Sequence, residues 1–292
     1  MAQSLVDLIK ILRERTGAGM MDCRSALLAC DSDLEKANDW LREKGLAKAA
    51  KKADRIAAEG LAIAKTCQGC GKTVLLEVNC ETDFVAKGDD FKSMVDNIAQ
   101  ILLHNEPSSL EEAKELTAQL FNEATVKMGE KFDLRRFTIL KQNEGEKITT
   151  YIHMGGKIAT AIVSKNLDDE TANALAMHVC ANNPQYIILE DVPEEAREHE
   201  LQVEAEAAKN DPKLANKPEN ILKNILQGKI NKYFGEMTLT LQPFLLDDSK
   251  TVGQLLSEKG ASILKFVRYQ VGEGIEKRKD DFASEVMNEV NK

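Results

Sequence analysis

Four consecutive residues, Thr82-Asp83-Phe84-Val85, combine a carboxylate and a large aromatic ring at a point where both side chains can project. An apolar run at 74–78 predicts a strand just before them, and we expect a helix to begin near Phe91. A ring on such a strand-to-helix turn can wedge into an apolar pocket, and the carboxylate can disturb a nearby cation or its water shell. The alternative is that Asp83 caps a turn and Phe84 lies in the core.

Motifs typical of enzymes are missing from the sequence. It contains no phosphate-binding G-x-x-x-x-G-K-[ST] loop, no G-x-G-x-x-G opening a helix and no G-x-S-x-G nucleophile elbow. The histidines are scattered and none has H-E-x-x-H spacing: His104, His153, His178 and His199. The sequence therefore favours a binding or regulatory protein over an enzyme, and we expect neither a catalytic residue nor a cofactor.

The cysteines are expected to be free thiols in a reducing compartment. They are Cys23, Cys30, Cys67, Cys70, Cys80 and Cys180. Cys67 and Cys70 form a C-x-x-C pattern with Gln-Gly between two strand-like runs, which favours a hairpin turn. Half a zinc site or a redox pair remains the alternative, although no second C-x-x-C or paired histidine accompanies it.

Composition and charge indicate an ordinary soluble protein. The 292 residues are 43% hydrophobic and 30% charged, with a net charge of −9, which argues against a dominant nucleic-acid surface. One basic patch, at residues 42–55, begins with Arg42 and ends with Arg55; it reads as a solvated helical linker or, alternatively, as an RNA site. No apolar run approaches the roughly 18 residues needed to span a bilayer, and the first residues do not resemble a secretory signal, so we expect a cytoplasmic protein without membrane contact.

The pattern of apolar residues predicts an α+β protein built from several modules. Three short helices are expected in residues 4–44, with Gly45 ending the third. The strands expected next are 56–64, 73–78, 137–142 and 148–153, with helices from 91 and over 111–128 between them. An αα-hairpin follows at about 193–233, then a helix capped near Thr251, a strand at 263–271 and a last helix containing Phe282, Val286 and Val290.

A short repeat suggests a duplication. Gly71-Lys72-Thr73 opens an apolar strand, a turn and a helix, and Gly156-Lys157-Ile158 does the same. We therefore expect two related α+β core subdomains with a helical insertion in the second. The predicted domains are 1–55 (three helices and linker), 56–142 (first core subdomain), 143–190 with 235–272 (second core subdomain), 191–234 (inserted hairpin) and 273–292 (C-terminal helical module).

Several motifs, in order along the chain, resemble bacterial elongation factor Ts. They are TGAGMMDC at 16–23, EVNCETDFV at 77–85, AMHV at 176–179, KTVGQL at 250–255 and VGEGIE at 271–276. The resemblance covers essentially the whole chain. It implies a ubiquitin-associated-like three-helix domain, two related core subdomains, an inserted coiled-coil hairpin and a C-terminal helical module.

The resemblance also implies a function. The family promotes GDP release from the GTPase elongation factor Tu and exchange for GTP, binding the GDP-bound and nucleotide-free states. It implies that Thr82, Asp83, Phe84 and Val85 enter near the nucleotide and dislocate Mg²⁺. Further partner contacts implied by matching position are Arg13, Met20, Met21, Met128, Gly129 and His153.

Some alternatives stay open at this point. Met20 and Met21 are as well explained by core packing, and His153 by a surface position at a strand end. The hairpin is left with two roles, a homodimer contact or a contact with the partner's distal domain. A ribosome- or RNA-binding accessory protein using the basic patch is the rival function; otherwise no direct nucleic-acid contact is expected.

Overall fold

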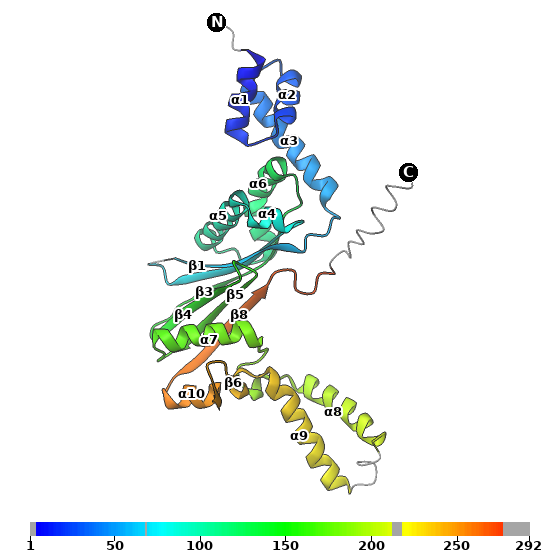
Figure 1. Cartoon of the computed structure of the whole chain (residues 1–292), viewed down its shortest axis with the longest axis vertical. Coiled ribbons are helices and arrows are strands. Elements are labelled where there is room, and N and C mark those ends of the chain that lie inside the picture. Colours follow the sequence, from blue (N-terminus) through cyan, green and yellow to red (C-terminus); the bar gives the residue numbers. More distant parts are fainter. Residues whose placement is uncertain (1–3, 68, 212–217, 277–292) are drawn as a thin grey trace.

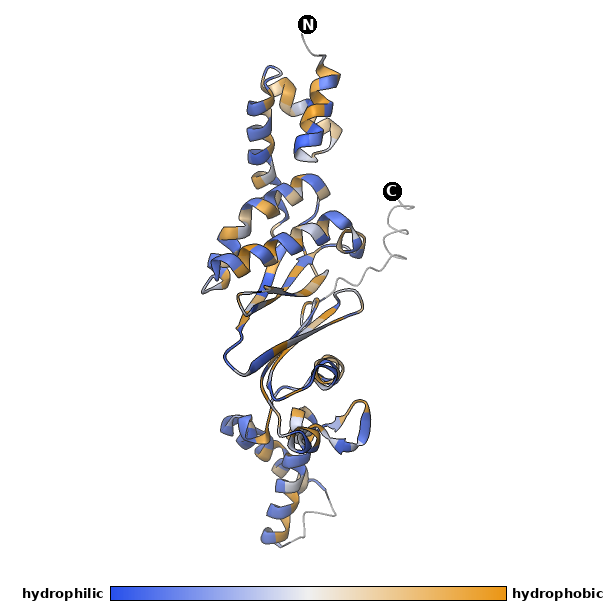
Figure 2. Ribbon diagram, turned by 90° about the vertical axis from the view of Figure 1, so that its left-hand side faces the viewer, coloured by the Kyte–Doolittle hydropathy of each residue, from blue (hydrophilic) through white to orange (hydrophobic). Residues whose placement is uncertain are grey.

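The chain has an α+β fold, which the computed structural model describes for residues 4–67, 69–211 and 218–276. The molecule is elongated, with a three-helix domain at one end, two β-sheets in the middle and a helical hairpin at the other end (Figure 1). Most helices alternate between hydrophobic and hydrophilic residues along their length (Figure 2), as expected of helices that bury one face.

The N-terminal domain consists of α1 (Leu5–Thr16), α2 (Met20–Ala29) and α3 (Leu34–Lys52). Ser4 caps α1 by accepting a hydrogen bond from the Asp7 backbone, and Asp33 caps α3 in the same way. The small core contains Leu12, Cys23, Leu27 and Leu41, and Val126 from a later helix packs against it. This domain therefore draws part of its core from the rest of the molecule.

The prediction that Gly45 ends the third helix is wrong, because α3 continues to Lys52. Gly45 instead allows a close helix contact: a Cβ atom there would lie 2.7 Å from Cγ2 of Val126 and 3.2 Å from the carbonyl oxygen of Asn122. A glycine inside a helix costs about 1 kcal/mol relative to alanine. Here that cost is offset by the packing of α3 on α6 (Leu110–Met128).

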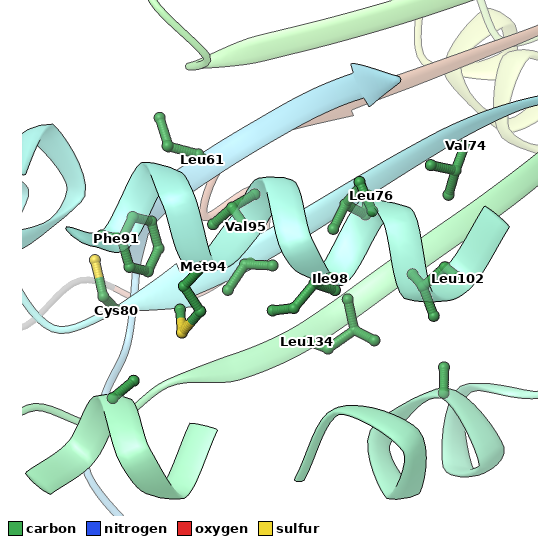
Figure 3. Close-up of a cluster of buried hydrophobic side chains, with 14 of the residues drawn as sticks. Leu61, Val74, Leu76, Cys80, Phe91, Met94, Val95, Ile98, Leu102 and Leu134 are labelled. Atoms are coloured by element: carbon green, nitrogen blue, oxygen red, sulfur yellow. The ribbon is translucent and has the colours of Figure 1, made fainter. Parts of the chain in front are cut away.

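The first sheet has the strand order β1 (Glu59–Cys67), β2 (Lys72–Cys80) and β3 (Asp133–Lys141), all antiparallel. Residues 56–58, predicted as strand, precede β1 instead. Between β2 and β3 lie α4 (Asp83–Lys87), α5 (Asp89–Asn105) and α6. The apolar stripe of α5, with Phe91, Val95, Ile98 and Leu102, faces Leu76 of β2 and Leu134 of β3 (Figure 3).

The second sheet has the strand order β4 (Glu146–His153), β5 (Ile158–Lys165) and β8 (Ser262–Gln270), again antiparallel. Helix α7 (Asp169–Asn182) covers it, and a small hairpin of β6 (Pro243–Phe244) and β7 (Asp247–Thr251) leads into α10 (Val252–Glu258). In each half, a strand hairpin is followed by helices and by a third strand that pairs with the second. The two halves thus share one connectivity, while the boundaries assigned to the domains stay predictions.

The two sheets are joined by an apolar layer and by a buried carboxylate. Ala62 and Leu75 of the first sheet pack with Ala159, Ala161 and Tyr269 of the second. Beside this layer, Glu77 of β2 is fully buried. Its carboxylate accepts hydrogen bonds from Arg135 (3.0 Å) and Arg136 (2.6 Å) of β3 and from the backbone of Gly272 (2.8 Å), just after β8.

Helices α8 (Glu194–Lys209) and α9 (Glu219–Met237) form the helical hairpin. Lys229 of α9 pairs with Glu204 of α8 at 2.6 Å. Their base is fixed by a small cluster in which Ile230 and Phe234 pack with Val192 and Tyr186. Helix α9 extends beyond the predicted end near Tyr233, because these last turns belong to the base cluster.

The expectation of free thiols is wrong for Cys67 and Cys70, which form a disulfide across the β1–β2 turn. The hairpin predicted there is confirmed. Cys23, Cys30, Cys80 and Cys180 are free. The last helix predicted, with Phe282, Val286 and Val290, lies outside the described residues. Among the helices that the structure describes, none is long and apolar enough to cross a membrane.

Candidate functional site

The four residues singled out in the sequence form the start of a short helix. Thr82 is the N-cap of α4, and its hydroxyl accepts a hydrogen bond from the Val85 backbone at 3.4 Å. The helix after β2 therefore begins at Asp83, and α5 begins at Asp89, close to the predicted start near Phe91. The turn expected at 82–85 is a cap and a first helical turn, in which Thr82 and Phe84 are exposed while Val85 packs against the core.

Phe84 is the most exposed large apolar residue of the described chain, with 84% of its surface accessible to solvent. Phe91, on the next helix, is fully buried. The neighbours of Phe84 anchor the helix: Ala86 is buried, and Val85 packs against the core of the first sheet. The interpretation of Phe84 as a core residue is wrong, and its ring is free to enter a partner.

Asp83 forms an ion pair with Lys87 within the same helix, at 2.6 Å. The hydrogen bond from Lys87 lowers the pKa of the Asp83 carboxyl below its usual value, and the charge of Lys157 lowers it further. Asp83 therefore carries a full negative charge at neutral pH. It is not the helix cap, which is Thr82; its charge is paired with the exposed Lys87.

Glu130, which the sequence did not single out, holds the turn before α4. Its Oε2 accepts hydrogen bonds from the backbone of Glu81 (3.0 Å) and Thr82 (3.1 Å), and its Oε1 accepts one from the Thr82 hydroxyl (2.5 Å). The sequence carries no signal for this contact, because Glu130 and Thr82 are 48 residues apart.

Met128 and Gly129, predicted as partner contacts, directly precede Glu130 at the end of α6. Met128 is half-buried and packs against the core of the first sheet, so part of its surface is structural. Gly129 is exposed and caps α6 in the left-handed conformation, with φ 76°. Among the described residues, apart from Gly129 and its chain neighbours, no atom lies within 4 Å of a Cβ built there, so the backbone conformation, and not space, requires glycine at this position.

Met20 and Met21 lie in the first turn of α2 and are 59% and 65% exposed. The alternative that they pack in the three-helix core is wrong. Arg13, on α1, is exposed as well. The loop before α2 approaches α6, since Gly17 lies close to the side chain of Lys127. The loop that precedes the exposed methionines therefore lies next to the end of α6.

His153 ends β4 and is half-buried, with Nδ1 3.2 Å from the Tyr151 hydroxyl. The next residue, Met154, is 73% exposed and adopts a positive φ of 48°, a feature that the sequence analysis missed. The turn that follows is attached to β1: the Ala62 backbone donates to the Gly156 carbonyl, and Lys157 pairs with Glu59 at 2.5 Å. Because α4 also contacts β1, the structure brings this turn and α4 to the same strand.

The rival sites are largely explained by internal contacts. In the basic patch at 42–55, Lys48 pairs with Asp22, Arg55 with Glu81, and Lys52 donates to the Gly129 carbonyl. His178, buried in α7, shares hydrogen bonds with Gln242 and the Leu245 backbone; burial lowers its pKa and favours the neutral form. Within the part of the chain that the structure describes, no group of three or more metal-ligating side chains is present.

A comparison with known protein families gives a match that covers most of the chain. The model of the family described as Elongation factor TS matches residues 81–273. The matched region begins at Glu81, next to Thr82, and includes α4, Met128, Gly129, Glu130 and His153. It does not include the three-helix domain or the basic patch.

Proposed function

Because the chain belongs to the elongation factor Ts family, whose role in translation elongation is nucleotide exchange on elongation factor Tu, we propose that α4 opens the Mg²⁺ and phosphate site of this GTPase. The observation that carries the proposal is the exposure of Phe84, at 84%, on a short helix whose neighbouring residues are anchored in the core. Burial of an exposed aromatic ring by a partner stabilises the complex by roughly 25 cal/mol per Å² of apolar surface removed from water.

The two side chains have different tasks in this mechanism. In GTPases of this kind, Mg²⁺ bridges the nucleotide phosphates and the protein and holds the switch regions in place. The Phe84 ring displaces an element beside that site. The Asp83 carboxylate, released from Lys87, competes for the cation or its water shell; exposed ion pairs of this spacing are weak, so the release costs little.

The factor needs only to bind the nucleotide-free GTPase more tightly than the GDP-bound form. By thermodynamic linkage, GDP then weakens the binding of the factor by the same ratio. In this proposal the exposed residues Met20, Met21, Met154 and Gly129 add contact area to that of α4. We assign half-buried His153 and exposed Arg13 to the same proposed contact with the partner.

The proposal is tested by the release of a fluorescent GDP analogue from elongation factor Tu, followed by stopped flow with and without this protein. We expect substoichiometric amounts to accelerate release, and the chain alone to hydrolyse no GTP. Unchanged release, or GTP turnover by the chain free of contaminating GTPase, would contradict the proposal.

Repeating the measurement with Mg²⁺ chelated separates the two side chains. The effect of Asp83→Ala should shrink when the metal is already removed, whereas the effect of Phe84→Ala should partly persist. Lys87→Ala is the control for Asp83→Ala, because it breaks the same ion pair and keeps the carboxylate. Equal losses in all three variants, independent of Mg²⁺, would remove the carboxylate from the mechanism.

A further inference from the structure

We propose that Glu130 is a positioning residue for nucleotide exchange: its carboxylate fixes the start of α4 and thereby the direction in which Phe84 projects. This inference rests on the proposed function of α4. Glu130 itself need not touch the nucleotide.

The hydrogen bonds to Glu130 place the carboxylate at the chain segment that leads into α4. Both backbone N–H groups at the start of the turn, from Glu81 and Thr82, donate to Oε2, and the Thr82 hydroxyl donates to Oε1. The same hydroxyl accepts from the Val85 backbone as the helix cap. One carboxylate therefore orients both the cap residue and the chain leading into it, and hydrogen bonds to a charged acceptor are stronger than neutral ones.

Glu130 is itself held in place from two sides. The left-handed conformation of Gly129 turns the chain at the end of α6, and the next residue points back to the turn before α4. Lys131 then closes a reciprocal contact: its backbone N–H donates to the Glu81 carboxylate at 2.7 Å, and its ammonium donates to the carbonyl oxygens of Ala53 and Arg55. The carboxylate is therefore presented by a fixed backbone.

The helix that it fixes cannot hold its own direction. With five residues, α4 is far shorter than the about 12–15 residues that an isolated helix needs for marginal stability. Buried Ala86 and half-buried Val85 attach it to the core, but they lie on the side away from the exposed Phe84 ring. Without Glu130, the first turn can rotate about this attachment, and the ring samples many directions where exchange needs one.

The test is the rate of GDP release from elongation factor Tu at saturating factor, measured for Glu130→Ala. We expect a decrease of about tenfold, the effect of losing one charge-assisted set of hydrogen bonds. The matched control is Glu112→Ala. Glu112 accepts from the backbone N–H and hydroxyl of Ser108 in the same manner, but at the turn before α6, and its loss should leave the rate unchanged.

A double mutant shows whether Glu130 acts through Phe84. If it does, Phe84→Ala/Glu130→Ala should release GDP no more slowly than Phe84→Ala alone, because a ring that is absent cannot be misdirected. Losses that multiply would overturn the proposal, since a merely structural role would add to the loss of the ring.

Two conservative variants keep the test independent of folding. Glu130→Gln retains an acceptor oxygen for the two N–H groups but loses the charge, and should recover part of the rate. Glu130→Asp retains the charge but withdraws it by one methylene, and should lie between wild type and Glu130→Ala. If thermal unfolding shows Glu130→Ala to be unfolded, the GDP-release rate of Glu130→Asp is compared with that of the wild type instead. A folded Glu130→Ala or Glu130→Asp protein with the wild-type rate overturns the inference, whereas a wild-type protein that accelerates nothing overturns the proposed function instead.

Discussion

Phe84 and Phe91 have the same side chain in opposite environments, which allows a direct test of what the exposed ring does. Phe84→Ala should change the free energy of unfolding by less than about 0.5 kcal/mol, because an exposed side chain contributes little packing. Phe91→Ala should cost about 3–5 kcal/mol, because it leaves a cavity under α5. Urea unfolding measures both.

The same two variants should separate in the opposite order when exchange is measured. Phe84→Ala should slow GDP release while the protein stays folded. Phe91→Ala should retain exchange in proportion to the fraction of folded protein. Wild-type exchange by Phe84→Ala across a range of factor concentrations would show that the ring has no part in the mechanism.

At this scale the sequence indicated the candidate residues that lie next to one another in the chain, but not Glu130 or Met154. Thr82, Asp83 and Phe84 can be recognised in the sequence because their structural setting, a strand followed by a helix cap, is formed by residues next to them in the chain. Glu130 and Met154 cannot, because the role of Glu130 depends on a contact with a turn 48 residues earlier and the exposure of Met154 on how a β-turn meets β1. Single-sequence patterns contain local periodicity and caps, but no record of which distant segments meet.

At the scale of elements, Glu106 ends α5 and ties it to the sheet. Its carboxylate pairs with Lys141 of β3 (2.6 Å) and with Lys72 of β2. The hydrogen bonds from these two lysines lower the pKa of Glu106 to about 2, from an ordinary value of 4.5. A carboxyl with a lowered folded-state pKa stabilises the fold fully above its unfolded value and loses this contribution as the pH falls through its folded value.

We therefore expect Glu106→Gln to lower the thermal midpoint at pH 6, with the difference from wild type shrinking between about pH 4.5 and about pH 2. Lys141→Gln removes the partner with the larger effect and should reproduce part of this behaviour. A difference between Glu106→Gln and wild type that stays constant over the whole range would mean that charge plays no part at this site.

The helical hairpin offers a second test at this scale. We predict that it is peripheral to exchange, so that removing it leaves most of the activity. The structure indicates which residues a deletion should keep, because Ile230 and Phe234 belong to the base cluster with Val192 and Tyr186. Deleting 198–227 with a short linker should keep the fold and the exchange rate, whereas deleting the whole of 193–234 should also lower the thermal midpoint, because it empties the base cluster.

The reason why some element boundaries were not predictable is visible in two helices. Gly45 looked like a helix end, and only the close approach of α6 explains why α3 continues through it. Similarly, α9 continues through Gly235 because its last turns pack on Tyr186, which is far away in sequence. Helix interiors were predictable from periodicity, but their ends depended on tertiary contacts.

At the scale of the whole molecule, the proposed exchange surface draws on both halves. Helix α4 belongs to the half with the first sheet, while His153 ends a strand of the second sheet and Met154 directly follows it. Their relative positions therefore depend on how the two sheets are joined. The repeated Gly-Lys openings at 71 and 156 indicated that the two halves are related. Nothing in the sequence indicated which groups connect the two sheets.

The buried Glu77 is the polar part of that connection. It joins β2, where it lies, to Arg135 and Arg136 of β3 and to Gly272 after β8, and Arg136 also stacks over the Tyr269 ring at 4.4 Å. Glu77→Gln keeps the shape but leaves two guanidinium groups without their shared counter-charge. Breaking a buried ion pair in this way costs about 3–5 kcal/mol; since both arginines are partly exposed, we expect about 3 kcal/mol by urea unfolding.

Glu273→Gln is the matched control for this prediction. Glu273 pairs with the same Arg136, at 3.2 Å, but is 41% exposed at its side chain, so its loss should cost less than about 1 kcal/mol. If the join between the sheets also sets the exchange geometry, Glu77→Gln should slow GDP release at temperatures where it is still fully folded, because α4 and the turn at Met154 no longer share a fixed frame. Equal stability of the two variants would show that water replaces the counter-charge and that the apolar layer alone holds the sheets together.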